Sequence, residues 1–547
     1  MDHAESQPDS SRSLEEEEAP VVGNHAEHCS GNQTFHALLS EDTEDTEETE
    51  GQRPGHPIDA STNTEPKRRC CGWLRRRCPC PPRGLLASLI TKASMATVLF
   101  GVVWSITEDE CLPGGNLFGI VIVFICSLIG GKLVGLVRLP RLPPLPPLLG
   151  MLLAGVLLRN IPVVTEAVYI DFRWSASLRN GALAVILTRA GLGLDASALK
   201  KLKAVCVRVA AGPCLIESST VALLSHFLMG LPWIWGFILG FVLGAVSPAV
   251  VVPSMLLLQK DGYGAEQGVP TLLMAAGSFD DVLAITGFTT CLGIAFATGS
   301  TWFNILRGFL EVLGGVVVGV ALGFFLRYFP SEDQKGLVLK RSFLLLGLGV
   351  FAVFGSNVAG FPGSGGLCTL VLAFLAGTGW ENNKASVEEV VGKVWDVFQP
   401  LLFGLIGAEI RVGALEPITV ALGLATLSIA LSVRIFFTFL MVLCAGFDLK
   451  EKIFIALAWM PKATVQAAIG STALDTARVK QDEECQRFGM DVLSVAVLSI
   501  LITAPLGALL IGLCGPRLLR RPKNPEWAVS QGTLSPSDAR VTYESAI

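Results

Sequence analysis

The sequence predicts an all-α polytopic membrane protein with about 14 transmembrane helices. Of its 547 residues, 51% are hydrophobic and only 16% are charged, whereas about a quarter of the residues in a typical soluble domain are charged. Apolar runs of the length needed to span a bilayer, about 20 residues, also follow one another from residue 85 to residue 515. Soluble cores cannot bury apolar segments of this total length, so a membrane must surround them.

Breaks at charged, proline-rich and glycine-rich loops separate these runs. Each run is an expected spanning helix, with boundaries that are soft by several residues. The expected helices lie near 85–107, 116–137, 147–165, 178–198, 203–229, 233–258, 268–297, 302–328, 340–358, 364–379, 389–410, 417–445, 451–475 and 489–514.

The chain outside these helices is polar and its charges are segregated. Acidic runs dominate the first segment, and arginine clusters flank both ends of the apolar region. No apolar region follows Met1, so we expect no signal peptide. The predicted organisation is a disordered acidic cytosolic tail (1–65), a basic, cysteine-rich juxtamembrane segment (66–84), the transmembrane domain (85–515) and a cytosolic C-terminal tail (516–547).

The positive-inside rule supports this topology. Both arginine clusters must face the cytosol, which requires an even number of spans. The expected outer loops near 108–115, 225–232, 298–301 and 359–363 contain no Lys or Arg, whereas most of the expected inner loops contain several. Both termini are therefore predicted to be cytosolic. Plasma membrane and endosomal membranes are the expected compartments, and a mitochondrial membrane is disfavoured because the N-terminus does not resemble a transit peptide.

Composition also limits the function classes. No basic domain is large enough for a nucleic-acid binder, and no cofactor motif is present. The 14 cysteines are scattered and do not form a disulfide framework. Four of them lie beside the first span among arginines, where acylation is the functional interpretation: Cys70, Cys71, Cys78 and Cys80.

Two adjacent carboxylates, Asp280 and Asp281, lie midway along the run 268–297. An ionisable residue within a span indicates a functional site by default. Two neighbouring carboxylates in hydrocarbon cannot both stay ionised and unpaired, so they must hold protons or a cation. Carboxylate oxygens favour hard cations such as Na⁺ or Li⁺. The alternative is a structural pair that caps a neighbouring helix end.

Three further charges lie within expected spans: Glu217 in the run 203–229, Arg434 in 417–445 and Lys462 in 451–475. Glu217 and Arg434 are each nearly alone in their helix, so each is a candidate partner for the other. We expect them to act as an ion pair or gate, with Lys462 as a further member. Structural roles are favoured for three weaker candidates: Arg189, Asp396 and Glu409.

Two runs carry internal prolines, Pro248 within 233–258 and Pro461 within 451–475. Proline removes a backbone donor and frees a carbonyl one turn earlier. A membrane-spanning helix can contain such a break where the broken stretch lines a cavity. The alternative is a simple kink. Spans five to seven and twelve to fourteen place a charged helix, a proline-broken helix and a third helix in the same order, seven spans apart. This order predicts an inverted-topology repeat with two crossed discontinuous helices.

These residues resemble the cation/proton antiporter superfamily. The Asp280–Asp281 pair, one helix after a proline-broken helix, together with Arg434 and Pro461–Lys462, is similar to its electrogenic branch, typified by the NhaA and NapA antiporters. Segments 112–119, 244–253 and 275–281 look like those of the animal NHA-type sodium/hydrogen exchangers. The resemblance covers about residues 85–515.

The resemblance implies a homodimer with a dimerisation domain and a six-helix core, here about 203–297 and 417–514. It implies that the core moves like an elevator against the remaining helices, and that 85–107 is an additional first helix available for dimer contacts. Membrane lipids surround such a protein, and the tail 1–65 is a candidate segment for cytosolic partners. No enzymatic activity is implied.

The implied activity is exchange of Na⁺ or Li⁺ for H⁺, with cation and protons competing for Asp280 and Asp281. Asp281 is the expected direct ligand. Backbone carbonyls freed near Val246 and at Gly277 are candidates to complete the ion shell, with Ser247, Ser278 or Thr464 helping. One departure is that Arg434 occupies a position where NhaA-type proteins carry lysine. Arginine does not release its proton, so the stoichiometry stays open.

Three other classes of protein are alternatives. An organic-anion/sodium symporter on the same inverted-repeat fold is the main alternative, although paired carboxylates disfavour an anionic substrate. An intramembrane aspartyl protease needs its two aspartates on different helices, whereas these are adjacent. A non-transporting scaffold whose tails recruit partners leaves the intramembrane charges unexplained.

Overall fold

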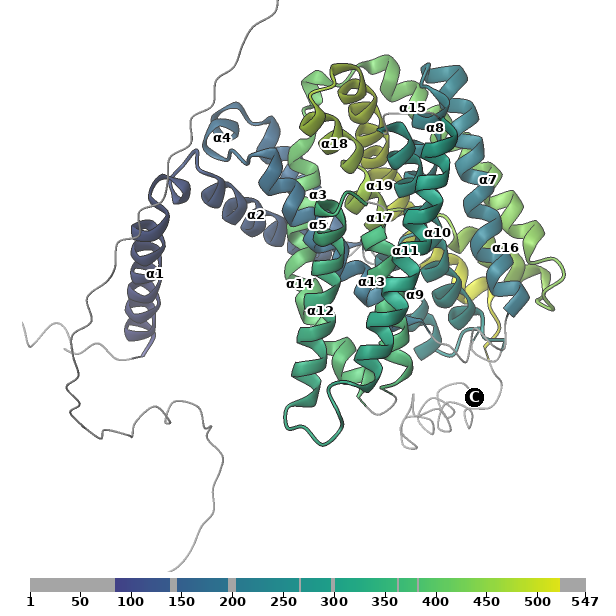
Figure 1. Ribbon diagram of the computed structural model, residues 1–547, viewed down its shortest axis with the longest axis horizontal. Coiled ribbons are helices and arrows are strands. Elements are labelled where there is room, and N and C mark those ends of the chain that lie inside the picture. Colours follow the sequence, from purple (N-terminus) through teal and green to yellow (C-terminus); the bar gives the residue numbers. More distant parts are fainter. Residues whose placement is uncertain are drawn as a thin grey trace, which may run out of the picture. The chain divides into compact units, whose positions relative to one another are not determined.

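The computed structural model describes residues 84–137, 145–194, 203–264, 267–296, 301–361, 364–380 and 383–521. Within these ranges all regular secondary structure is helical (Figure 1). The expectations for the tail 1–65, for the four juxtamembrane cysteines and for the C-terminal tail beyond residue 521 lie outside the described residues.

The helices follow the apolar runs of the sequence. The first half contains α1 (Leu85–Thr107), η2 (Glu108–Cys111), α2 (Asn116–Leu136), α3 (Pro147–Asn160), α4 (Pro162–Ala167), α5 (Phe172–Gly193), α7 (Lys203–Met229), α8 (Trp233–Gly244), α9 (Pro248–Lys260) and α10 (Val269–Ala295). The second half contains α11 (Thr301–Tyr328), α12 (Leu337–Val358), α13 (Ser364–Thr378), α14 (Lys384–Glu409), η3 (Val412–Ala414), α15 (Pro417–Met441), α16 (Leu449–Ala458), α17 (Thr464–Ile469), α18 (Thr472–Lys480) and α19 (Glu483–Leu518).

Ten helices in the described part of the chain are long and apolar enough to cross a membrane, and α3 and α13 are shorter apolar helices. The two remaining predicted runs, 178–198 and 451–475, correspond to α5 and to α16 with α17. Each predicted run therefore coincides with helix, which confirms an all-helical membrane protein. The number of fourteen spans stays a prediction.

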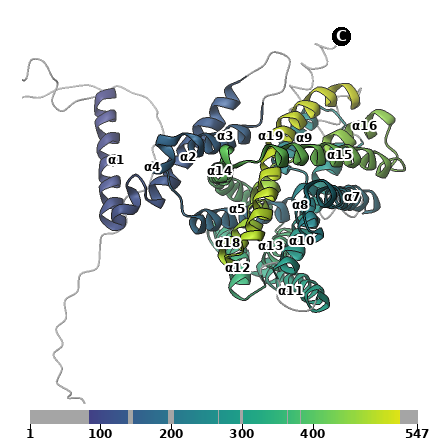
Figure 2. The same cartoon turned by 90° about the horizontal axis from the view of Figure 1, so that it is seen from above.

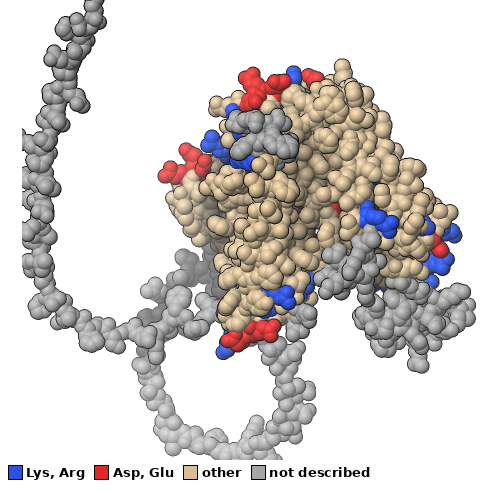
Figure 3. Space-filling model, turned by 45° about the vertical axis from the view of Figure 1, so that its right-hand side comes forward, with Lys and Arg blue, Asp and Glu red and all other residues tan. Residues whose placement is uncertain are grey.

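Charged side chains gather toward two opposite ends of the face in Figure 3, and a wide band between them is almost free of Lys, Arg, Asp and Glu. Apolar side chains such as Leu313, Val317 and Phe351 are at least half exposed. A soluble protein rarely leaves so much apolar surface uncovered. The band is therefore the surface that lipid covers.

Local sequence signals explain where several helices begin. Pro147, Pro248 and Pro417 each occupy the first turn of their helix, where the missing N–H costs nothing. Asp448 and Glu451 form a reciprocal capping box at the start of α16.

The helices pack in two sets. In the first, α7 packs against both α8 and α15, α10 packs against α8 and α9, and α19 packs against α9 and α16. In the second, α14 packs against α2, α3 and α5, and α13 packs against α5, α11 and α12. Figure 2 shows helices of both sets side by side when seen from above. None of the residues of α1 is buried.

Candidate functional site

The two proline-containing helices are interrupted, and their interruptions touch. α8 ends at Gly244 and α9 begins at Pro248, while α16 ends at Ala458 and α17 begins at Thr464. Figure 1 shows α8 and α9 as separate segments, and α17 packs against α8. The Ser247 N–H donates to the Pro461 carbonyl at 2.8 Å, and the hydroxyls of Ser247 and Thr464 lie 3.4 Å apart. Irregular backbone thus lies at the centre of the helical bundle, which requires every freed polar group to find a partner.

Side chains from other helices and from the second break satisfy the carbonyls of the first break. Gln466 Nε2 donates to the carbonyls of Val242 (3.0 Å) and Ala245 (2.9 Å). Lys462 Nζ donates to the Leu243 carbonyl, and Arg434 Nη1 donates to the Gly244 carbonyl. Four successive carbonyls therefore have partners, as buried backbone groups must.

Helix α19 supports the second break. The Lys462 N–H donates to the Thr503 hydroxyl at 3.0 Å. Pro461 packs against Gly507 so closely that a Cβ at Gly507 would lie 2.3 Å from Pro461 Cγ. Gly507 is therefore required for the close approach of α19 to the broken segment.

A buried charge network surrounds the crossing. Glu217 accepts from Arg434 Nη1, and its Oε1 lies 2.8 Å from Lys462 Nζ. Arg434 Nη2 lies 2.9 Å from Asp280 Oδ2. All four side chains are 0% exposed. Breaking a buried pair of this kind leaves an uncompensated charge in low dielectric, so the members stabilise one another.

The Asp280–Asp281 pair lies at the end of this network. Asp280 Oδ2 also accepts from the Val246 N–H at 2.7 Å. In contrast, Asp280 Oδ1 and both carboxylate oxygens of Asp281 are buried and have no hydrogen-bond partner among the described residues. Buried polar atoms without partners are rare. Three such oxygens on adjacent residues form a group that can accept a proton or a hard cation.

The structure brings most of the predicted site residues to one place. Around the crossing lie Glu217, Val246, Ser247, Pro248, Asp280, Asp281, Arg434, Pro461, Lys462 and Thr464.

The Val246 N–H binds Asp280 Oδ2, and the ion-binding role of carbonyls near Val246 stays a prediction. Gly277 lies one turn before Asp281 within intact α10, and a Cβ there would have no heavy atom within 4 Å. The Ser278 hydroxyl donates within its own helix, to the Met274 carbonyl at 3.3 Å.

Gln466 and Thr503 were not predicted from the sequence, although both bind backbone groups of the two helix breaks. A lone glutamine within the apolar segment 464–469 was a signal for Gln466, since an amide in hydrocarbon needs partners. Nothing in the sequence distinguishes Thr503 from other hydroxyl residues that bond to their own helix.

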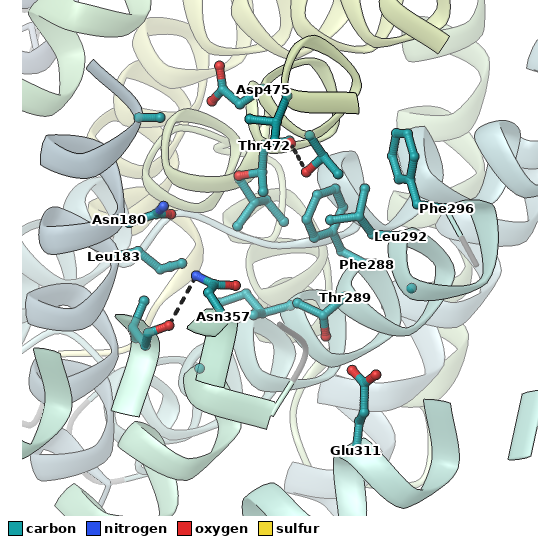
Figure 4. Close-up of a pocket in the computed structure, with 18 of the residues that line it drawn as sticks. Asn180, Leu183, Phe288, Thr289, Leu292, Phe296, Glu311, Asn357, Thr472 and Asp475 are labelled. Carbon is teal, nitrogen blue, oxygen red and sulfur yellow. Dashed lines mark hydrogen bonds between the residues drawn. The ribbon is translucent and has the colours of Figure 1, made fainter. Parts of the chain in front are cut away.

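A cavity of about 580 Å³ extends along α10 beyond Asp281. Ile285, one turn after Asp281, and then Phe288 and Leu292 line it from α10. Figure 4 shows that Asp475 and Thr472 of α18 lie on one side of this cavity, with Glu311 of α11 on the opposite side. Because residues three and four apart share a helix face, Asp281 and these apolar side chains follow one stripe. The cavity thus ends within one helical turn of the carboxylate pair.

An ion cluster at the rim of this cavity joins α5 and α14 of the second set to α18, which packs against α19 of the first set. Arg179 of α5 binds Asp475 of α18 at 2.7 Å and Glu409 of α14 at 3.3 Å. Arg478 binds Glu409 at 3.1 Å. Arg179 was not singled out from the sequence, because a charge close to the start of an apolar run resembles a snorkelling residue.

The two arginines of this cluster differ in burial, so the same substitution at each should change stability by different amounts. We expect Arg179→Gln to lower the free energy of unfolding by about 3–5 kcal/mol, because two carboxylates then lose a buried partner. Arg478 is 23% exposed, and Arg478→Gln should cost less than about 1 kcal/mol. Thermal unfolding of the purified protein in detergent measures both, and equal effects would contradict the assigned burial.

Comparison with known proteins identifies the family. Residues 115–514 match the protein family described as "Sodium/hydrogen exchanger, transmembrane". The chain is 68% identical to the human sodium/hydrogen exchanger 9B2 over 448 residues, which cover 82% of this chain and 83% of that protein. It is 57% identical to the human sodium/hydrogen exchanger 9B1 over 446 residues, 82% of this chain and 86% of that protein.

The chain belongs to the sodium/hydrogen exchanger family. It is therefore a membrane transporter of the cation/proton antiporter superfamily rather than an enzyme, and the symporter alternative is not favoured. The fold agrees: the structure of the antiporter MjNhaP1 from Methanocaldococcus jannaschii at pH 8 superposes with a TM-score of 0.60 and covers 74% of this chain and 99% of that one. At 18% identity, this similarity concerns the fold alone.

Proposed function

We propose that this protein exchanges Na⁺ for H⁺ across a membrane, and that cation and proton compete for Asp280 and Asp281. The observation that carries the proposal is a set of three buried carboxylate oxygens that lie beside two crossed helix breaks and accept no hydrogen bond from the described residues. Family membership supports Na⁺ and H⁺ as the exchanged ions. Li⁺ has the same hard-cation chemistry and is proposed as a second substrate. No cofactor is needed for this chemistry.

The proposed cycle follows from the cost of buried charge. Asp281 accepts no hydrogen bond in the described chain, so its ionised form needs a bound cation to stabilise it. When the cation leaves, a proton must replace it before the site is closed from water. Asp280 differs, because Arg434 and the Val246 N–H already hold one of its oxygens. We therefore assign Asp281 as the main exchanging group and Asp280 as a second ligand through Oδ1.

The charges of the network support one-for-one exchange. Glu217, Asp280 and Asp281 are three acids, and Arg434 and Lys462 are two bases that contact Glu217. With all five ionised, the network carries a net charge of −1. One Na⁺ or one H⁺ neutralises it. The site is then neutral in both loaded states, and moving it through a low-dielectric environment costs little free energy.

Proteoliposomes test this function. A Na⁺ gradient is expected to drive proton flux, and the rate should be the same whether the membrane potential is clamped or imposed. A rate that follows the imposed potential would contradict one-for-one exchange, whereas absence of Na⁺- or Li⁺-driven flux would contradict the exchanger proposal itself.

We propose an elevator-like movement of a core against a scaffold. The core comprises about 203–297 and 417–514, that is α7 to α10 and α15 to α19. The repeated order of a charged helix, a broken helix and a third helix supports this division. The ion cluster around Arg179 joins α5 and α14 to α18, so it is proposed to hold core and scaffold in the arrangement described here and to open during transport.

The assembly and its placement are further proposals. No residue of α1 is buried. This exposure supports a homodimer in which a second copy of the chain, or lipid, covers α1. The distribution of basic residues supports cytosolic termini, with plasma membrane or endosomal membranes as the compartment. The acidic tail 1–65 is proposed to bind cytosolic partners.

A further inference from the structure

Arg341 is a buried cation that forms no close ion pair with any residue that the structure describes. It lies in the first turns of α12 and is 2% exposed. Its Nε and Nη1 groups are buried and have no hydrogen-bond partner among the described residues. The part of the chain that the structure describes also gives it no ion pair within 4 Å. A buried charge in this state is costly unless an opposite charge compensates it.

One neighbour stabilises the Arg341 guanidinium in part. The guanidinium lies 5.2 Å from the centre of the Trp380 ring, in a cation–π contact. Trp380 is 1% exposed, and its Nε1–H donates to the Leu326 carbonyl at 3.0 Å. The ring is therefore fixed and holds the guanidinium plane in place. A ring quadrupole does not provide the negative charge that a buried cation needs.

Arg341 lines a cavity of about 430 Å³. Arg327 and Tyr328, from the end of α11, form another part of its wall. Glu332 is the one acid among the described residues that line the cavity. It is exposed and acts on Arg341 only from a distance beyond that of a close ion pair. The two arginines therefore exceed the acid by one positive charge.

Gly379 allows Arg327 to line this cavity. A Cβ at Gly379 would lie 2.3 Å from Arg327 Cγ and 3.2 Å from its Cβ and Cδ. Real Cβ atoms do not approach that closely, so any larger residue would push the arginine stem away. The sequence at the end of α13 thus leaves room for the second guanidinium beside the first.

We propose that this cavity binds a phosphate monoester group. Guanidinium groups donate paired N–H bonds that match phosphate oxygens. The Tyr328 hydroxyl supplies a further donor, and a dianionic phosphate offsets both arginines. The cavity lies at the α11–α12 connection, which the positive-inside rule assigns to the cytosolic side. The group is therefore either a free cytosolic phosphate ester or the headgroup of a lipid, and both have the same chemistry at this site.

This site is separate from the exchange site. None of Arg327, Tyr328, Glu332 and Arg341 contacts the two helix breaks in the described contacts, and all four belong to α11, α12 or the segment between them. The proposal therefore does not depend on the proposed exchange activity, and binding can be measured without transport.

The experiment measures the unfolding midpoint of the purified full-length protein in detergent at constant ionic strength. The probes are inorganic phosphate, glycerol 3-phosphate, short-chain phosphatidic acid and short-chain phosphatidylcholine, with chloride as the salt control. Saturable stabilisation by the soluble phosphates indicates a free phosphate ester. Stabilisation by phosphatidic acid alone, and not by phosphatidylcholine, indicates a lipid headgroup.

Variants assign the binding to the cavity. Arg327→Gln and Arg341→Gln should each weaken binding of the stabilising probe about tenfold or more, since a hydrogen bond to a charged group contributes that much. Lys335→Gln removes the same charge from the α11–α12 segment, outside the cavity wall, and should leave binding unchanged. Gly379→Ala changes no charge and should weaken binding as Arg327→Gln does. If Arg341→Gln does not fold, Gly379→Ala still tests whether the probe binds in this cavity.

Two results would overturn the proposal. One is that no phosphate-bearing probe raises the unfolding midpoint above the chloride control. The other is that Arg327→Gln and Lys335→Gln weaken binding to the same extent while Gly379→Ala has no effect. The second result would show diffuse attraction to a basic surface instead of a site.

Discussion

Asp281→Asn is expected to lower Na⁺-driven proton flux by about 100-fold or more, because the variant loses both a charged cation ligand and an exchangeable proton. It should nevertheless fold as well as the parent or better. Neither carboxylate oxygen of Asp281 has a hydrogen-bond partner in the described chain, so the amide removes an uncompensated buried charge without breaking a bond. Flux in proteoliposomes and the unfolding midpoint in detergent measure the two effects.

Asp280→Asn should behave differently from Asp281→Asn, although the residues are adjacent. Asp280 is bound to Arg434 at 2.9 Å and to the Val246 N–H at 2.7 Å, so this variant is expected to lose stability as well as flux. Asp396→Asn, on the exposed surface of α14, is the matched control and should retain both. If Asp281→Asn kept robust Na⁺-driven flux, the assignment of Asp281 as the exchanging group would be wrong.

The second large effect concerns Glu217. Glu217→Gln should lower the free energy of unfolding by about 3–5 kcal/mol, because Arg434 and Lys462 both lose their carboxylate at 0% exposure. Lys462→Met should also destabilise, since it leaves Glu217 under-compensated and frees the Leu243 carbonyl. The double variant is expected to recover part of the loss, because removing both charges of a buried pair costs less than removing one.

A double-mutant cycle measures this coupling. Unfolding of the parent, both single variants and the double variant gives an interaction energy, which we expect to exceed about 1 kcal/mol. Strict additivity of the two single effects would show that Glu217 and Lys462 do not interact. Exchanging the charges of Glu217 and Arg434 is the weaker test, because the swap places an acid beside Asp280 and a base beside Lys462.

The sequence by itself determined the membrane-spanning helical class, because apolar length and charge segregation are properties of composition. It also determined which residues require an explanation. Asp280, Asp281, Glu217, Arg434 and Lys462 each stand out, since a charge within an apolar run is costly wherever the helix packs. The proline positions could likewise be predicted as interruptions, because a missing N–H is a local property.

Only the tertiary structure decided which of these residues meet. Arg434 and Glu217 are 217 positions apart in the sequence. Arg434 also reaches Asp280, whereas Asp281 accepts no hydrogen bond from any residue that the structure describes. Gln466 and Thr503 acquire their roles solely because the two helix breaks cross beside α19. The same holds for Arg341, which is buried against the Trp380 ring without a close ion pair among the described residues. Composition fixes the cost of burying each charge, whereas three-dimensional packing decides which charges are compensated.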